Sequence, residues 1–491
     1  MARPHFASRL PLVLSTVAGL AALPRVAFAG GYDTPILYSA RHMGMGGTAI
    51  GYVNDPSSLF HNPAGLGGIR GLEAMANFSP LTGSITSSPG SGPDTMAGPD
   101  GAFPSRKTEP AVSPLFLVGA AYRLAEPVTF GIGVYPVAAA AGEYKLTDIQ
   151  GRPYIDKTRL VFLEISPGLS VEVVKGLYLG AGYRATITTL ERVKGVESDP
   201  REFNFTLKGT NATGFRVGAQ YHVNENFSVG VVYRHKIEPE LTADKTFAYF
   251  EITDAKTTFV LPSKLGLGLS GKMDRLHGAL DFEYGFYSQN ERSDLSGYRA
   301  SINRREVVPN VFGWQNAITA RVGLEYLLGA ESQIPVRVGY VFDGKVGNKM
   351  YPTAFGTPPA PSNTFTVGGG YRGGDKWQAN LAFAYRFASA TVTAADVMGA
   401  EPCASCAKPG NDYSLKMMGF YLDFSYRFDV APIFGGASSS AAEPPLAPPP
   451  PAPAPTPTPA PTPASSSEPA PPPPAGAPPP PAPAPAPAPP P

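Results

Sequence analysis

Apolar and polar residues alternate along many segments of the chain between residues 71 and 428. In the clearest segment, 377–387, every odd position is apolar or aromatic, whereas Gln378, Asn380 and Arg386 occupy even positions. In a β-strand this period of two sends one set of side chains to each face of the sheet. The pattern therefore predicts strands that have one apolar face and one polar face.

The links between these segments alternate between short and long. The short links are Ala125 to Pro127, Lys175 to Gly176, Asn224 to Asn226, Met273 to Asp274, Gly329 to Gln333 and Gly373 to Asp375. The long links cover 82–113, 136–158, 192–210, 239–260, 289–313, 344–362 and 389–414. Short turns at one end and long loops at the other are typical of outer-membrane barrels. Counting the strands between these links gives about fourteen, an even number as expected of a bacterial single-chain barrel. We therefore predict an all-β fold, an antiparallel transmembrane β-barrel of about fourteen strands at 71–428.

Two other architectures fit the pattern less well. A soluble β-sandwich also alternates, but it keeps its apolar face inside and its links generally short. Beyond residue 30, charged or turn residues interrupt every apolar run before it reaches about 18 residues, the length expected of a membrane-spanning helix. Aromatic residues such as Tyr122, Tyr233 and Tyr426 lie near strand ends. Rings of this kind favour the headgroup boundary, so we expect outer-membrane lipid around the barrel.

The N-terminal residues 1–29 predict a secretory signal peptide. They contain a basic head, an apolar core and, at Ala27 to Ala29, the small-x-small pattern of a cleavage site. The mature chain should therefore begin near Gly30, outside the cytoplasm. Together with the barrel pattern, this leader predicts a location in the bacterial outer membrane.

A small glycine-rich segment, 30–70, precedes the first strand, and its stretch 39–66 reads SARHMGMGGTAIGYVNDPSSLFHNPAGL. This stretch resembles the FadL/TodX (OMPP1) family of outer-membrane transporters for long-chain fatty acids and other hydrophobic compounds. In that family an N-terminal hatch with Gly-Met-Gly-Gly and Asn-Pro-Ala elements plugs the lumen. The matching residues are Met43, Gly44, Met45, Gly46, Gly47, Asp55, Pro56, Asn62, Pro63 and Ala64. Since glycine, proline, aspartate and asparagine favour tight turns, we expect these residues to frame the hatch.

The resemblance also implies how a ligand would move. It implies passive diffusion of a hydrophobic small molecule through a hatch-gated barrel, with a kink in the third strand that opens the wall sideways. The third predicted strand, 128–136, contains Gly131, Gly133 and Pro136. Glycine and proline weaken strand pairing, so we predict the lateral opening beside them. The alternative is an ordinary glycine-rich barrel strand.

Basic residues at inward positions are candidate contacts for the carboxylate head of a ligand, because the arginine fork matches a carboxylate. By strand parity these residues are Arg184, Arg216, Arg234, Lys264, Arg321, Arg337 and Arg386. The alternative is that inward carboxylates pair with them and only stabilise the barrel. The inward carboxylates are Asp281, Glu283, Glu325 and Asp343.

Composition narrows the remaining chemistry. The net charge is +1 and 16% of the residues are charged, so no polyanion-binding surface and no nucleic-acid ligand are indicated. The histidines lack metal-ligand spacing and no Gly-x-Ser-x-Gly motif occurs. We therefore expect no metal, no cofactor and no enzymatic activity, although a catalytic triad assembled across strands would leave no local motif.

The two cysteines, Cys403 and Cys406, lie three residues apart in CASC. In an exported protein we predict that they close a short disulfide-bonded turn. A metal or redox site is the alternative, but no second pair and no neighbouring histidine accompanies them.

The C-terminal segment 429–491 is mostly proline and alanine and cannot bury a core, so we expect it to be disordered. An even strand number places it in the periplasm, where polyproline II geometry would make it a semi-rigid spacer. It would then contact peptidoglycan or a periplasmic protein, with inert low complexity as the alternative. Two further functions stay open, a general polar porin with a water-filled lumen and a structural tether between outer membrane and cell wall.

Overall fold

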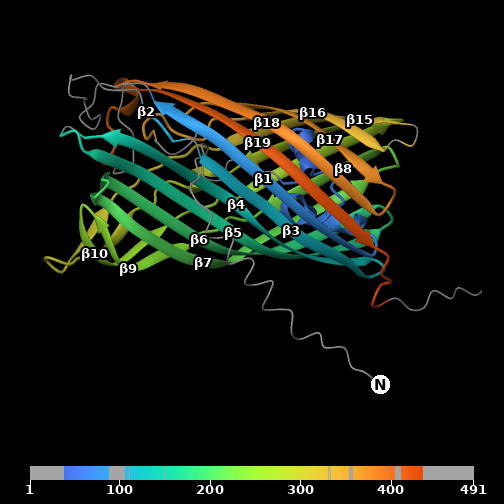
Figure 1. Ribbon diagram of the computed structural model, residues 1–491. Helices are drawn as coiled ribbons and strands as arrows, with labels where there is room; N and C mark the ends of the chain where they lie inside the picture. The colour runs from blue at the N-terminus through green and yellow to red at the C-terminus, as the bar shows by residue number, and fades with distance from the viewer. Residues whose placement is uncertain are drawn as a thin grey trace, which may run out of the picture. The chain divides into compact units, whose positions relative to one another are not determined.

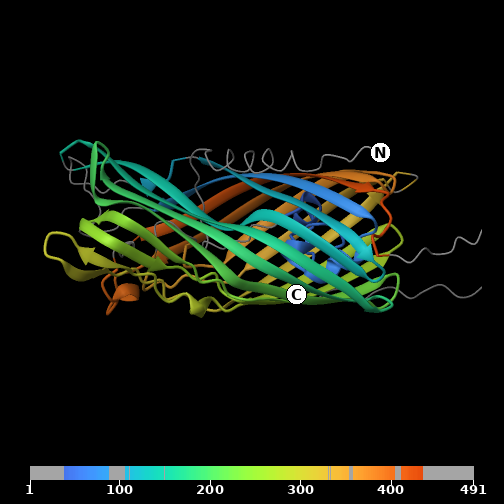
Figure 2. The same cartoon turned by 90° about the horizontal axis from the view of Figure 1, so that it is seen from below.

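Strands of alternating polarity close into a barrel around a small helical segment in the computed structural model (Figures 1 and 2). The structure describes residues 38–87, 106–109, 111–148, 150–329, 331, 333–352, 358–403 and 411–434.

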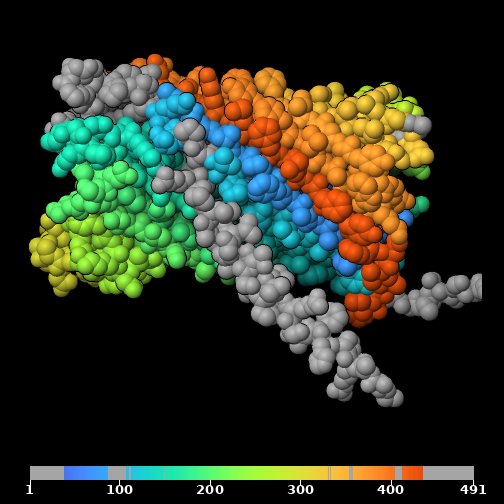
Figure 3. Space-filling model, in the orientation of Figure 1, coloured from blue at the N-terminus to red at the C-terminus, as the bar shows by residue number. Residues whose placement is uncertain are grey.

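Fourteen strands form the wall, and each pairs antiparallel with the next. They are β1 (Leu72–Ser87), β3 (Ala111–Ala125), β4 (Val128–Thr147), β5 (Pro153–Val174), β6 (Leu177–Val196), β7 (Asp199–His222), β8 (Phe227–Arg234), β11 (Lys264–Met273), β12 (Leu276–Gly285), β15 (Ala317–Leu328), β16 (Ile334–Asp343), β17 (Ser362–Gly373), β18 (Trp377–Val392) and β19 (Asn411–Phe428). The wall closes where β19 pairs with β1, with Leu72 opposite Phe428. The two strands run side by side across the face shown in Figure 3. The predicted barrel class and strand number are confirmed.

Short additional strands extend the sheet at the end of the barrel that carries the long links (Figure 1). They are β2 (Arg106–Lys107), β9 (Glu240–Ala248), β10 (Phe250–Thr258), β13 (Leu295–Arg299) and β14 (Arg304–Val308). Strand β9 pairs with β7 and β10, β10 pairs with β13, and β13 pairs with β14. Two single 3-10 turns, η2 (Tyr287–Gln289) and η3 (Ala395–Val397), also lie in the long links.

Three of the predicted long loops are wrong, because they are mostly strand: 239–260 consists largely of β9 and β10. The link 192–210 belongs almost entirely to β6 and β7, and 136–158 contains the ends of β4 and β5. Past the bilayer, a strand no longer has lipid on its outer face, so that face becomes polar. In this part of β7, Phe203 and Leu207 are buried, whereas Asn204, Thr206 and Lys208 are exposed.

Along the wall, apolar side chains point outward and polar ones inward. On β19, Phe420 and Leu422 are 52% and 53% exposed, whereas Asp423 and Ser425 are buried. This is the arrangement that lipid outside and protein inside require. Among the described residues, no helix has the length and apolar character to cross a membrane.

The hatch occupies the lumen near the end with the short turns, where Figures 1 and 2 show it in blue. It consists of α2 (Ala40–Gly44), α3 (Ser58–His61) and the 3-10 helix η1 (Pro63–Gly68). Nearly all its residues between Tyr38 and Gly67 are buried. Helices this short depend on tertiary packing rather than on their own propensity, so the barrel wall holds the hatch in shape.

Candidate transport site in the lumen

The Met43–Gly47 motif ends helix α2 in a tight turn. The Gly47 amide donates to the His42 carbonyl at 2.8 Å. Gly46 and Gly47 have φ values of 67° and 74°, a left-handed conformation that glycine adopts without steric cost. The Gly46 amide also donates to Thr366 Oγ1 of β17 at 3.0 Å. The motif is therefore a turn that is fixed to the wall.

Inward-facing glycines let the hatch backbone lie directly against that wall. They occur as pairs that face each other on neighbouring strands. This glycine belt consists of Gly180, Gly218, Gly230, Gly268, Gly323 and Gly339. A methyl group on Gly323 would overlap the Met45 carbonyl oxygen, and one on Gly339 would overlap the Gly46 amide nitrogen. No residue with a side chain fits at these positions while the hatch keeps its place.

The Asn62-Pro63-Ala64 motif joins the hatch to β7. Asn62 precedes η1, Pro63 stands at its start, and Asn62 Oδ1 accepts a hydrogen bond from the Ala64 amide at 3.2 Å. Asn62 Nδ2 donates to the Ile50 carbonyl at 2.9 Å and to the Ala219 carbonyl of β7 at 3.1 Å. One side chain thus caps a helix and fixes it to the barrel.

Two wall carboxylates hold the rest of the hatch. Asp281 of β12 accepts from the Ala49 and Ile50 amides at 2.8 and 3.1 Å. Asp423 of β19 accepts from Ser39 Oγ at 2.8 Å and from the Arg41 amide at 3.3 Å. Charge-assisted hydrogen bonds of this kind are stronger than neutral ones.

The Asp55-Pro56 motif is a local turn. Asp55 Oδ1 accepts from the Ser57 amide at 2.9 Å, and Pro56 is buried. Asp55 also lies 3.4 Å from His42 Nε2. The ring of His42 is 5.2 Å from that of His61, so histidines that are scattered in sequence meet inside the hatch. No group of three metal-ligating side chains forms in the part of the chain that the structure describes.

Six of the seven inward cations face carboxylates. Arg184 and Arg216 contact Glu164 at 2.7 and 3.3 Å, and all three side chains are at most 2% exposed. The other pairs are Lys264 and Arg321 with Glu283 at 3.3 and 3.5 Å, Arg337 with Glu325 at 2.7 Å, and Arg386 with Asp343 at 3.5 Å. These contacts favour the alternative in which lumen cations stabilise the barrel.

Arg234 differs from the other six. Its guanidinium donates to the Phe60 carbonyl at 3.3 Å and lies 5.2 Å from the centre of the Phe60 ring. No described carboxylate forms an ion pair with it, and its side chain is half-buried. Arg234 is therefore the inward cation with the most capacity for a further anionic partner.

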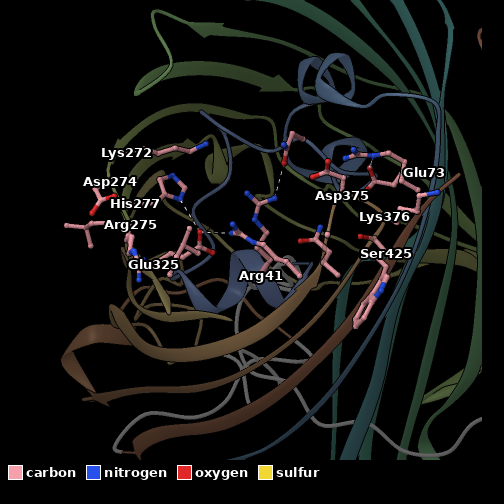
Figure 4. Close-up of a pocket in the computed structure, with 18 residues that line it drawn as sticks. Arg41, Glu73, Lys272, Asp274, Arg275, His277, Glu325, Asp375, Lys376 and Ser425 are labelled. Carbon is pink, nitrogen blue, oxygen red and sulfur yellow. Dashed lines mark hydrogen bonds and ion pairs between the residues drawn. The ribbon is translucent and has the colours of Figure 1, made fainter. Parts of the chain in front are cut away.

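A polar cavity of about 360 Å³ lies between the hatch and the short turns (Figure 4). Arg41 lines it from the hatch and donates to Asn54 at 2.9 Å. From the wall, Arg372 donates to Glu325 at 2.9 Å, and His277 Nδ1 lies 3.9 Å from the same carboxylate. Lys272, Asp274 and Asp375 add charges around it. An apolar molecule gains little in such surroundings because burial there removes polar groups from water.

Two apolar clusters fill the lumen beyond the charges. The hatch cluster contains Tyr38, Leu59, Phe60, Leu66, Leu117 and Tyr135 among its members. The outer cluster reaches the additional strands and contains Phe162, Phe203, Ile237, Leu241, Ile252 and Trp314 among its members. Val137 of β4 packs against both clusters. Apolar side chains thus continue from the long-link end of the lumen to the hatch.

Val137 also marks the place where β3 and β4 part. The two strands pair up to Val118 opposite Val134, and no described ladder pair joins them beyond that point. Strand β3 continues along β1, while β4 continues along β5 with a register shift between Pro136 and Ala138. The wall is therefore interrupted on one side of β4, next to the junction of the two apolar clusters.

Gly131 and Gly133 precede this interruption along β4, in the part of the strand that pairs with β3. A methyl group on Gly131 would lie 3.1 Å from Leu66 Cδ2, and one on Gly133 would lie 3.1 Å from Leu59 Cδ1. These glycines make room for the hatch leucines. The strands separate nearer to Pro136, which lacks an N–H for the ladder.

Comparison with known proteins shows which family the chain belongs to. A family model described as "Outer membrane protein transport protein (OMPP1/FadL/TodX)" matches residues 21–428. The chain belongs to the FadL/TodX family. The family consists of outer-membrane transport channels for hydrophobic compounds, and the match assigns this chain to the same membrane. No curated protein matches the chain.

Solved structures share the fold at low sequence identity. A Pseudomonas aeruginosa FadL homologue has a TM-score of 0.62 and 15% identity, covering 82% of this chain and 100% of the homologue. The P. putida toluene transporter TodX has a TM-score of 0.60 and 17% identity, covering 80% of this chain and 99% of TodX. The Ralstonia pickettii toluene transporter TbuX has a TM-score of 0.57 and 16% identity, covering 80% and 98%.

Within this FadL/TodX architecture, two features escape sequence reasoning. Glu164, which holds two arginines, lies at an inward position of β5, and that parity is its only signal. The glycine belt has a clearer sequence signal, because a glycine recurs at an inward-facing position on several successive strands. Cys403 is disulfide-bonded, but Cys406 lies outside the described residues, so the pairing stays a prediction.

Proposed function

We propose that hydrophobic small molecules, long-chain fatty acids or similar compounds, diffuse passively into the long-link end of the lumen and leave sideways between β3 and β4. The observation that carries this proposal is the interruption of the wall beside Val137, where the two apolar clusters meet. A ligand on this route stays among apolar side chains, and each Å² kept from water is worth about 25 cal/mol.

The other end of the lumen argues against straight passage. A ligand continuing along the barrel axis would have to pass the hatch and then the charged cavity around Arg41 and Glu325. The hatch is held there by backbone contacts with the glycine belt and by Asp281 and Asp423. Sideways exit requires neither displacement of the hatch nor contact with these charges.

Filling the interruption should block exit. Ala139 of β4 is buried beyond the point where β3 and β4 part. In Ala139→Phe we expect slower uptake, because the added ring would occupy the gap that the ligand must cross, and an increase of roughly 1.4 kcal/mol in that barrier lowers a rate tenfold. The measurement is initial uptake of a labelled long-chain fatty acid and of labelled toluene by cells.

The matched control is Ala181→Phe, which adds the same ring to an exposed position on β6. It should leave uptake of both compounds unchanged at equal surface expression. Parental uptake by Ala139→Phe would contradict sideways exit. The compound whose uptake is lost in Ala139→Phe and kept in the control identifies the class of ligand that the barrel transports.

Arg234 is the residue we propose to bind the head of an anionic ligand. Loss of a hydrogen bond to a charged group costs about 1.5–3 kcal/mol, so Arg234→Gln should weaken fatty-acid uptake and leave toluene uptake unchanged. Arg201→Gln is the control, since that side chain is 78% exposed and far along β7. If Arg234→Gln took up fatty acid as fast as the parent, the head contact would lie elsewhere.

We further propose the domain limits and the place of the C-terminal tail. Residues 1–29 are a signal peptide, 30–70 the hatch and 71–428 the barrel. Residues 429–491 are a tail in the periplasm, where peptidoglycan or a protein would be its partner. Support comes from β19, which ends at Phe428 on the side of the short turns. Protease added to intact cells should spare a tag at the C-terminus and digest it after the outer membrane is permeabilised.

A further inference from the structure

The chain does not leave the barrel at the last residue of β19. Residues Asp429–Phe434, here called the C-terminal strap, continue beyond the segment that matches the family model, which ends at residue 428. The Phe434 amide donates to the Leu124 carbonyl of β3 at 2.9 Å, and Tyr122 Oη of β3 donates to the Ala431 carbonyl. The strap therefore passes β1 and is fixed to the second strand of the wall.

The strap lies on the outer surface of that strand. Successive residues of β3 alternate, and Arg123 is buried toward the lumen, where it donates to the Ile69 carbonyl of the hatch at 3.0 Å. Tyr122, which precedes Arg123, must then point outward. Since Tyr122 bonds to the strap, the strap is on the lipid-facing side of β3.

The side chains of the strap that are exposed are mostly apolar. Val430, Ile433 and Phe434 are 43%, 65% and 71% exposed. They continue the outward apolar surface of β19, where Phe424 and Phe428 are also exposed. Exposed apolar residues that extend an existing membrane-facing surface fit lipid better than water.

Several polar backbone groups of the strap have hydrogen-bond partners, which favours the edge of a membrane over its acyl interior. Polar backbone groups without partners are costly in an apolar environment. Here the Ala431 carbonyl and the Phe434 amide bond to β3, the Val430 amide donates to the Phe428 carbonyl at 2.9 Å, and Pro432 has no amide hydrogen. At the other end, Asp429 pairs with Lys376 at 2.6 Å, which keeps the charge at the turn between β17 and β18.

We propose that the C-terminal strap is a lipid-binding element, with Ile433 and Phe434 seated at the boundary between the acyl chains and the headgroups of the leaflet at the short-turn end. The strap fixes the start of the tail against the membrane beside β3. This inference does not depend on which compound the barrel transports or on where that compound leaves.

Fluorescence quenching tests the strap directly. An Ile433→Cys variant of the full chain, labelled with an environment-sensitive nitrobenzoxadiazole probe, is reconstituted into phosphatidylcholine vesicles. Cys403 is in a disulfide, so the introduced thiol takes the label. We expect a blue-shifted emission that is quenched by phospholipids brominated near the headgroup end of the acyl chain and resists iodide in the water.

Two further variants make the result specific. Glu225→Cys, at an exposed position of the turn between β7 and β8, should be quenched by iodide and not by brominated lipid. Adding Tyr122→Phe to Ile433→Cys removes the bond to Ala431, and iodide quenching at position 433 should increase. Heat-modifiable gel mobility checks that each barrel is folded.

Two results would overturn the proposal. Iodide quenching at position 433 equal to that at 225 would place the strap in water. Protection from both iodide and brominated lipid would mean that protein, from the barrel or from a partner, covers Ile433 in place of lipid.

Discussion

Replacing Gly323 and Gly339 together by valine is expected to unseat the hatch and make the barrel conduct ions. The new side chains would overlap backbone atoms of Met45 and Gly46, which cannot turn away as a flexible side chain can. Overpacking in a close-packed interior costs about 1–3 kcal/mol per site. The combined cost at two such sites is comparable to the free energy that hydrogen bonds contribute to holding this part of the hatch.

Single-channel recording in planar bilayers measures the effect. The parent barrel should show little conductance, whereas the double variant should show a persistent open level. Gly278→Val and Gly369→Val form the control, because the positions that their side chains would take contact no hatch atom. A closed double variant would mean that the wall, not the hatch, yields to the added side chains. A conducting parent would instead indicate a polar porin.

Removing the carboxylate of Glu164 should destabilise the barrel more than any other lumen charge change. Glu164 and Arg216 are 0% exposed and Arg184 is 1% exposed. Glu164→Ala would leave two buried guanidinium groups without a counterion, and breaking a buried pair from one side costs about 3–5 kcal/mol. It would also remove one of the two acceptors near the Tyr135 hydroxyl, which lies 3.0 Å from Glu164 and 2.9 Å from the Leu59 carbonyl.

The urea midpoint of refolded barrels in detergent micelles reports this loss. Glu191→Ala removes a carboxylate from the same wall, but its pair with Lys157 is partly exposed, so we expect a change within about 1 kcal/mol. Equal midpoints for Glu164→Ala and Glu191→Ala would show that water or a neighbouring carboxylate compensates Arg184 and Arg216.

The wall could be predicted from the sequence because a membrane strand meets only two environments. At 377–387 the alternation assigns Leu381 to lipid and Asn380 to the lumen, and these residues are 58% and 6% exposed. The same logic fails where β6 and β7 leave the bilayer, because water replaces lipid there and the outer face becomes polar, while Phe203 stays buried on the other face. The outward apolar pattern is missing at 192–210, so the sequence predicts a loop where the structure has mostly strand.

Inside the lumen, sequence identifies which residues point inward but not which residues they meet. Parity places Arg184, Arg216 and Glu164 in the lumen, yet their cluster exists only because β5, β6 and β7 are neighbours with a particular register. The glycine belt contacts the backbone of the hatch, and a contact with backbone atoms leaves no pattern of side chains in the sequence. The sequence likewise does not show where β3 and β4 separate. Their separation depends on where the hydrogen-bonded pairing of the two strands ends, and no single residue determines that point.

The contact between Asp423 and the hatch bears on how the molecule assembles. Asp423 lies on β19, the last strand of the wall to be synthesised, and it binds Ser39 and Arg41, which precede the first strand. The hatch can therefore present hydrogen-bond donors to the closing strand before the seam with β1 has formed. On this view the plug is a template for closure, and the barrel is completed around it.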